Sequence, residues 1–338
     1  MKKTVVSAAL VVGMLLFGVG TYTAMGSLRG SGARVDHPAS SLVSVHGTLY
    51  LAQGGAIYRL HGTSFKQITP EEGWTQPAAS PDGSHLVAVK RSLNFADIYV
   101  LGADGQVQAR LTNNISRRVE ANHWAFYPRF SPDGSAVFFS YDSKDPSNTY
   151  RVDLAIFSRP ADPAAAQSTA WTQPNPYTGG DVGPLPLRQG LLFTRYSIDA
   201  HSQVHSQVWL QAGPGAAGTA LTPPADDCAQ AAVSPDGRFM AMVCRHGQLR
   251  AADLVVAPVD MTSGSIGAPV TLVSGRLVAA PTFSGDGMEI AYLSPASAGG
   301  PFQLWTVGSP AARKAGSPVQ VTQNLGFDST SAPVWLGT

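Results

Sequence analysis

The sequence is poor in charge. Only 13% of its 338 residues are Asp, Glu, Lys or Arg, and the formal net charge is +1. Residues of both signs are scattered, and the aromatic residues do not alternate with Lys or Arg. A nucleic-acid surface needs a basic stripe of the kind that is missing here, so we expect no nucleic-acid partner.

Helical patterns and catalytic motifs are also scarce. No long apolar stripe with a period of 3.6 residues follows residue 26, so we expect few helices. The sequence has neither a Gly-x-Ser-x-Gly nucleophile turn nor a glycine-rich phosphate loop that opens a helix. These absences argue against a prolyl-peptidase and predict a chain with no catalytic residues and no cofactor.

One long apolar run is present, at the N-terminus. Two lysines precede an uncharged run from Thr4 to Ser27, which is typical of an export signal. Small residues at Ala24 and Gly26 suit cleavage, but about 20 apolar residues also suffice to cross a bilayer once. We therefore predict a signal peptide or signal anchor over residues 1–26.

The domain after it should be periplasmic or extracytoplasmic, either secreted or anchored to the cytoplasmic membrane through residues 4–26. No cysteine near the end of the run offers lipid attachment. A flexible linker is expected over 27–41.

Four near-identical tetrapeptides mark an internal repeat. They are Ser80-Pro81-Asp82-Gly83, Ser131-Pro132-Asp133-Gly134, Ser234-Pro235-Asp236-Gly237 and Ser284-Gly285-Asp286-Gly287. Each suits a tight turn in a β-hairpin, because Pro presets φ, Asp bonds its own backbone and Gly accepts a positive φ. The spacing is about 50 residues, a propeller-blade period, with one double step that holds a degenerate copy at Pro184 to Gly190.

A second mark ends each unit, where a short strand stops at an apolar residue followed by Thr or, once, Val. The six marks are Ile68-Thr69, Leu111-Thr112, Trp171-Thr172, Leu221-Thr222, Leu272-Val273 and Val321-Thr322. A first strand then opens at or near Pro77, Pro128, Pro184, Ala231, Pro281 and Pro333. Six marks predict six blades.

The two ends of residues 42–338 complement each other. The segment before Thr69 supplies three strands (Thr48 to Gln53, Ala56 to Leu60 and Phe65 to Thr69) but no innermost strand, whereas Ala332 to Gly337 supplies one strand and stops. We predict an all-β, six-bladed propeller of four-stranded blades whose first blade is completed by the C-terminal strand. Closure of the ring removes free sheet edges, so we expect a monomer.

The only two cysteines, Cys228 and Cys244, stand at equal distances on either side of Asp236. If that turn is symmetric they oppose each other across one hairpin, at a spacing that permits a disulfide. An exported chain would meet an oxidising compartment, which favours the bond. The alternative is two small buried residues that stay unbonded.

The full pattern resembles the PD-type, WD-repeat-like β-propeller repeat of TolB-like proteins. The resemblance rests on the Ser-Pro-Asp-Gly turns, on Asp97-Ile98-Tyr99-Val100 and Gly102-Ala103-Asp104-Gly105, and on Leu111-Thr112-Asn113, and it covers 42–338. It implies an exported propeller that acts as a scaffold at the cell envelope. TolB itself carries an additional N-terminal α/β domain, where this chain has only the spacer.

Function should lie on one face of such a propeller. Asp82, Asp133, Asp236 and Asp286 recur, so we interpret them as structural turn residues. The opposite, loop face collects charged and aromatic residues, of which we single out Arg117, Arg118, Glu120, His123, Trp124, Tyr127, Trp74, His201 and His205 as partner-binding candidates. The His201-x-x-x-His205 spacing suits a helix, but it falls in a predicted loop, so we expect no metal there.

The leading interpretation is a non-enzymatic scaffold that binds a protein or peptide partner on the loop face. A hydrolase or lyase with its site in the central channel is the first alternative, although the inner strands Gln76-Pro77-Ala78-Ala79 and Gln230-Ala231-Ala232-Val233 are too apolar and small for a cation cage. The second alternative is a sensory or stabilising domain of a membrane-anchored complex.

Overall fold

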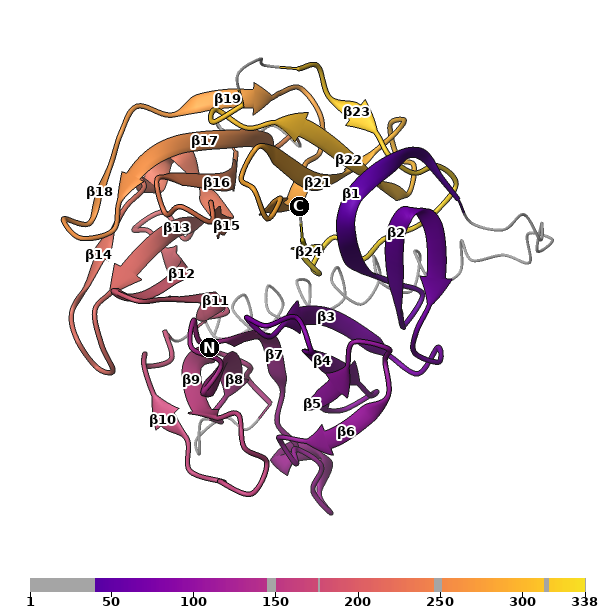
Figure 1. Cartoon of the computed structure of the whole chain (residues 1–338). Helices are drawn as coiled ribbons and strands as arrows, with labels where there is room; N and C mark the ends of the chain where they lie inside the picture. Colours follow the sequence, from indigo (N-terminus) through magenta and orange to yellow (C-terminus); the bar gives the residue numbers. More distant parts are fainter. Residues whose placement is uncertain (1–39, 145–149, 176, 246–250, 313–315, 338) are drawn as a thin grey trace, which may run out of the picture. The chain divides into compact units, whose positions relative to one another are not determined.

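The computed structural model describes residues 40–144, 150–175, 177–245, 251–312 and 316–337, which form a ring of six antiparallel sheets (Figure 1). The predicted export signal and nearly all of the predicted linker lie outside the described residues. The first strand begins at Ser40, two residues before the predicted start of the propeller. Among the described residues, no helix is both long and apolar enough to cross a membrane.

Each sheet is one blade, and its strands follow one another outward from the centre of the ring. Blade 1 contains β24 (Val334–Leu336), β1 (Ser40–Gln53) and β2 (Ala56–Gln67). Blade 2 contains β3 (Trp74–Ala79), β4 (His85–Arg91), β5 (Ala96–Gly102) and β6 (Val107–Arg110). Blade 3 contains β7 (Ala125–Phe130), β8 (Ala136–Asp142), β9 (Leu154–Pro160) and β10 (Thr169–Ala170).

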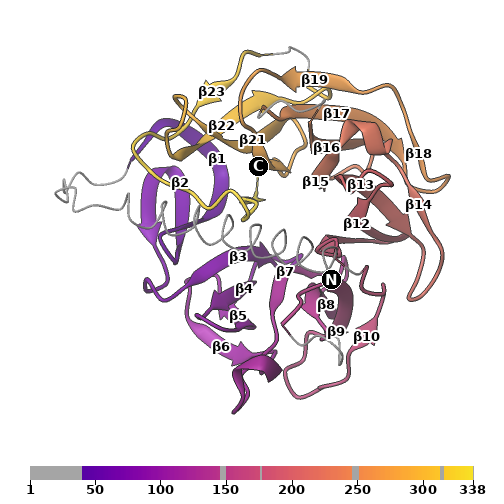
Figure 2. The ribbon, with the colours of Figure 1, turned by 180° about the vertical axis from the view of Figure 1, so that it is seen from behind.

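The other half of the ring repeats this order. Blade 4 contains β11 (Asp181–Leu187), β12 (Gly190–Ile198), β13 (Val204–Gln211) and β14 (Gly218–Ala220). Blade 5 contains β15 (Cys228–Val233), β16 (Phe239–Cys244) and β17 (Asp253–Asp260), with β18 (Ser265–Ile266) and β19 (Val270–Val273) both paired to β17. Blade 6 contains β20 (Ala279–Phe283), β21 (Glu289–Pro295), β22 (Phe302–Gly308) and β23 (Val319–Gln320). Figures 1 and 2 show β3, β7 and β15 near the centre and β6, β10 and β18 at the rim.

The predicted closure of the ring is confirmed. β24 pairs with β1 through Thr48↔Leu336, Leu49↔Trp335 and Tyr50↔Val334. The segment before Thr69 forms two strands, although three were predicted, because β2 continues into the predicted third strand. The chain nevertheless turns back on itself there, since the Ile68 amide donates to the Ile57 carbonyl at 2.9 Å. The end of this segment thus takes the outermost place in blade 1.

The recurring turns are built as their sequence predicts. In the first, Ser80 Oγ donates to Asp82 Oδ1 at 2.5 Å and accepts the His85 amide at 3.0 Å, and Gly83 has φ of 70°. The copies at Ser131, Ser234 and Ser284 repeat these bonds. The degenerate copy also closes a hairpin, between β11 and β12.

The apolar–Thr mark that ends each repeat unit has a structural role that could not be derived from the sequence pattern. In five blades the Thr hydroxyl accepts a backbone N–H of the third strand, at 2.8–3.0 Å; the pairs are Ile57–Thr69, Ile98–Thr112, Ile156–Thr172, Val208–Thr222 and Leu304–Thr322. Each bond ties the outer strand to its blade. Val273 lacks a hydroxyl, and β19 pairs with β17 through the backbone in that blade.

The core is divided among the gaps between blades. Six clusters of buried apolar side chains are present in the described chain, and each joins two neighbouring blades. The cluster of blades 1 and 6, for example, joins Leu49 and Trp335 to Leu293 and Leu304. Both faces of the inner part of each sheet are therefore covered, which explains why the second strands of blades 2–6 are apolar runs and do not alternate.

The predicted disulfide is confirmed. Cys228 and Cys244 are opposed in the register of β15 and β16 and are bonded to each other. Both are only 2% exposed.

The recurring turns predict how stability depends on pH. Hydrogen bonds to the carboxylates lower the pKa of Asp82, Asp133 and Asp236 from 3.8 to about 2. In each turn the hydrogen bond from the hydroxyl of the first serine makes the largest contribution. A carboxylate whose pKa is lower in the folded than in the unfolded chain stabilises the fold at any pH above its unfolded pKa. This stabilisation is lost as pH falls from about 4 to about 2. We expect the melting temperature of the Asp82→Asn, Asp133→Asn, Asp236→Asn triple variant to change less over this range than that of wild type. The exposed Glu71→Gln control should behave like wild type, and equal slopes for the triple variant would contradict the assignment.

Candidate functional site

The loop face consists of the loops that join second to third strands within a blade and the loops that lead into the next blade. Over blades 2–4, backbone hydrogen bonds connect these loops to one another. The Ala96 amide donates to the His123 carbonyl at 3.4 Å, and the Asp142 amide donates to the Trp124 carbonyl at 2.9 Å. The Leu154 amide continues the series by donating to Gly179 at 3.2 Å. This face is therefore a braced surface over blades 2–4.

The longest of these loops, between β6 and β7, is fixed at its base by Asn114. Its amide Nδ2 donates to the Ala96 carbonyl at 2.6 Å, and its backbone N–H donates to Asp97 Oδ1 at 2.9 Å. Asn122 Oδ1 accepts the Ser116 amide at 2.7 Å, and the short 3₁₀ helix η1 (Val119–Ala121) lies in the chain between these two residues. The loop is thus preformed.

Residues 115–119 form the tip of this loop, which is both apolar and basic. Ile115 is 53% and Val119 59% exposed, and Arg117 and Arg118 are exposed between them. The Nε atom of Arg118 lies 3.8 Å from Glu120 Oε1, a long and solvated ion pair that contributes little. The two arginines and Glu120 are among the residues predicted from the sequence, whereas the two aliphatic residues are not.

Exposed apolar side chains gather on the loops of the same blades. Of the fifteen large hydrophobic residues that are exposed in the described chain, eight lie in these loops or at the strand ends beside them: Leu93, Ile115, Val119, Tyr150, Val152, Tyr177, Ile198 and Val204. Single exposed hydrophobics need no explanation, but their accumulation on one face is typical of an interaction surface.

Four of the predicted binding residues do not reach this surface freely. Trp74 is 2% exposed in the core between blades 1 and 2, so it offers nothing to a partner. His123 is half-buried, donates from Nδ1 to the Asp142 carbonyl at 2.7 Å and stacks on Tyr141. Trp124 is half-buried, and its ring stacks on Phe126. His123 and Trp124 therefore brace the loop, and Tyr127 lies in β7 and lines the central cavity.

The two candidate histidines of blade 4 lie in and beside one hairpin turn, but they do not form a metal site. His201 is exposed, and Asp199 Oδ1 accepts its backbone N–H at 2.8 Å. His205 Nε2 lies 3.2 Å from Asp199 Oδ2. Nowhere in the described part of the chain do three His, Cys, Asp or Glu side chains come together as metal ligands would.

The innermost strands surround a cavity of about 310 Å³ at the centre of the ring. Five of these strands carry a bulge whose central residue has a positive φ: Gln76, Tyr127, Gly183, Gln230 and Ala280. The bulge amide of one blade can bond a side chain of its neighbour, as Tyr127 N–H does with Gln76 Oε1 at 2.7 Å and Ala280 N–H with Gln230 Oε1 at 2.8 Å. Four of the predicted first-strand prolines, Pro77, Pro128, Pro184 and Pro281, directly follow such residues and lie inside the strands, whereas Pro333 lies just before β24.

The walls of this central cavity are mostly apolar, with one exception. Among the described residues that line it, Arg129 alone carries a charge. Loss of hydration lowers the pKa of this guanidinium from 12.5 to about 10, so it remains charged at neutral pH. Burial raises the pKa of the neighbouring Tyr127 phenol to about 12, which keeps that hydroxyl protonated. Arg129 is not among the residues predicted from the sequence, although its charge, two residues before the second tetrapeptide, stands where the other copies have Ala78, Ala232 or Thr282.

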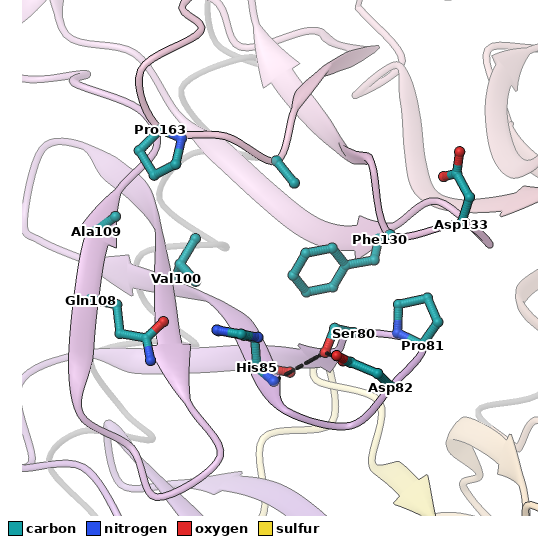
Figure 3. A pocket seen from close by; sticks show the side chains of 12 residues that line it. Ser80, Pro81, Asp82, His85, Val100, Gln108, Ala109, Phe130, Asp133 and Pro163 are labelled. Carbon is teal, nitrogen blue, oxygen red and sulfur yellow. Dashed lines mark hydrogen bonds between the residues drawn. The ribbon is translucent and has the colours of Figure 1, made fainter.

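A second cleft, of about 530 Å³, opens between blades 2 and 3 beside the recurring turns (Figure 3). The carboxylate of Asp82 is held there by Ser80 Oγ at 2.5 Å and by Ser84 Oγ at 2.8 Å. In the figure Asp133 points away from His85 and Asp82 across the cleft. The turn itself uses the polar atoms of Asp82, so this cleft has fewer groups to offer a ligand.

No family model matches the sequence, and no curated protein matches it either. Solved structures do. TolB from Acinetobacter baumannii has a TM-score of 0.61 and 18% identity, and the match covers 86% of this chain and 66% of that one. The chain thus spans just under two thirds of that protein. The putative TolB from Agrobacterium tumefaciens has a TM-score of 0.57 and 14% identity, covering 86% and 94%. The chain has the fold of a TolB-like propeller.

A third similar structure shows how widely this fold is used. A chain of the nidogen/laminin complex has a TM-score of 0.59 at 11% identity, and the match covers 85% of this chain and 97% of that one. At such identities the TolB-like architecture is shared, whereas the residues of any site are not. The function of this TolB-like propeller must therefore be argued from its own surface.

Proposed function

We propose that this chain is an exported, non-enzymatic propeller that binds a protein or peptide partner on its loop face at the cell envelope. The observation that carries the proposal is the tip 115–119, where two exposed aliphatic side chains flank two exposed arginines on a braced loop. A preformed loop loses little conformational freedom on binding, which favours affinity. A Cys228–Cys244 bond supports export, because disulfides persist in oxidising compartments.

The apolar and basic side chains of the tip indicate which kind of partner surface it would bind. Ile115 and Val119 would be buried against an apolar patch, and Arg117 and Arg118 would meet acidic side chains around it. Arginine is enriched at interfaces because its planar fork binds carboxylates through two hydrogen bonds. The neighbouring exposed residues Leu93 and Tyr150 could extend such an interface across blades 2 and 3.

Site-specific photo-crosslinking in the native host tests the proposal. A photoreactive amino acid at position 115 or 119 should give a discrete, protease-sensitive adduct of higher mass. Val107 and Val270, each 54% exposed on outer strands, are controls matched in size and exposure, and they should not give this adduct. The Arg117→Ala, Arg118→Ala double variant should reduce the adduct at 119 at least fivefold at an unchanged melting temperature. The same products at all four positions, or none at the tip, would refute a partner site on this loop.

A further inference from the structure

The central cavity combines one positive charge with apolar walls. Its lining includes Val182, Leu185, Val233, Phe283 and Trp335 from four blades, together with several prolines and alanines. No Asp, Glu, Lys or His is among its described lining residues. A cavity of this size and polarity is typical of small-molecule sites, in which a few polar groups fix the orientation of a largely apolar ligand.

No described residue is a partner for the guanidinium of Arg129. The described residues give it neither a hydrogen bond nor an ion pair, and loss of hydration is the one cause of its pKa shift. Arg195 differs, because it donates from Nε and Nη2 to the buried carboxylate of Asp181 at 2.8 Å each. Arg129 is half-buried, and an unpaired charge that is partly removed from water costs free energy, so folding alone gives no reason for this residue.

The other blades show what folding requires at this position. Arg129 stands two residues after the positive-φ residue of its strand, directly after the bulge. The equivalent residues are Leu185, Ala232 and Thr282, all of which also line the cavity. Neutral residues therefore satisfy the same backbone position in three other blades.

We propose that the central cavity binds a small monocarboxylate with an apolar body, and that Arg129 pairs with its carboxylate. The fork of a guanidinium matches the two oxygens of a carboxylate. One arginine and no second cation suit a single negative charge, and the apolar walls suit a hydrocarbon or aromatic body. Tyr127, Tyr196 and Thr194, which carry hydroxyl donors, also line the cavity. This site is separate from the loop tip and does not depend on partner binding there.

Calorimetric titration of the purified chain tests the proposal with 4-phenylbutanoate, 4-phenylbutan-1-ol and inorganic phosphate as probes. Wild type should bind the carboxylate at least tenfold more tightly than the alcohol, and phosphate more weakly than either. Arg129→Leu, which installs the residue of blade 4, should abolish the preference for the carboxylate. Arg129→Lys should keep part of it. Arg188→Leu removes an exposed arginine in the turn between β11 and β12 and should change nothing.

Thermal unfolding provides the control for folding, because Arg129→Leu should melt at or above the wild-type temperature. Three results would overturn the site: equal affinity of wild type for the carboxylate and the alcohol, a preference that survives Arg129→Leu, or no binding of the carboxylate at millimolar concentration. Phosphate binding as tight as that of the carboxylate would show a general anion site and would also overturn it.

Discussion

Deletion of residues 333–338 should prevent the isolated propeller from remaining a stable monomer. The deletion removes β24, uncovers the edge of β1 and takes Trp335 out of the core between blades 1 and 6. Trp335 is 7% exposed, and its Nε1 donates to the His46 carbonyl at 2.7 Å. An uncovered strand edge also invites pairing with other chains. Light scattering and thermal unfolding should show aggregation and a much lower melting temperature.

A single substitution separates the effect of the core from that of the strand. Trp335→Ala keeps the β24 backbone and should cost about 3–5 kcal/mol of unfolding free energy, as large-to-small core changes do. Val319→Ala in the outer strand β23 is the control and should stay within about 0.5 kcal/mol of wild type, because that residue is 44% exposed. A deletion variant that remained monomeric with the melting temperature of wild type would show that the ring does not depend on this clasp.

Loss of the disulfide should produce the second large effect. The bond joins residues separated by 16 positions, and the chain-entropy model gives about 3 kcal/mol for a loop of this length. Guanidinium unfolding with and without a reductant should show this difference in wild type. The Cys228→Ala, Cys244→Ala variant should show no dependence on the reductant. If the midpoint of wild type also ignores complete reduction, verified by thiol labelling, the bond contributes nothing to stability.

Most of the architecture follows from hydrogen bonds between residues that are near in sequence. Ser80 and Asp82 complete their turn within six residues, so the motif is recognisable wherever it recurs. Thr112 bonds Ile98 within one blade, which explains why the outer marks count the blades. The pairing of Cys228 with Cys244 and the closure by β24 follow from the same repeat, because each repeats a hairpin or strand position that the other blades define.

The candidate sites depend on contacts between blades, which are not encoded locally. Trp74 looked like a residue of an exposed loop, yet blades 1 and 2 bury it between them. The side-chain direction of Arg129 could not be derived by counting along its strand, because the bulge at Tyr127 breaks the alternation of side chains. The backbone N–H of Tyr127 is bonded to Gln76 of the preceding blade.

The sequence by itself determined the repeat, the number of blades, the clasp between the ends and the disulfide, since local turn chemistry and strand order are sufficient for all four. Only the tertiary structure decided that Ile115 and Val119 remain outside while Trp74 is covered, and that Arg129, which pairs with no described residue, lines the central cavity. Burial and side-chain direction are set by the neighbouring blades, which lie about 50 residues away along the chain.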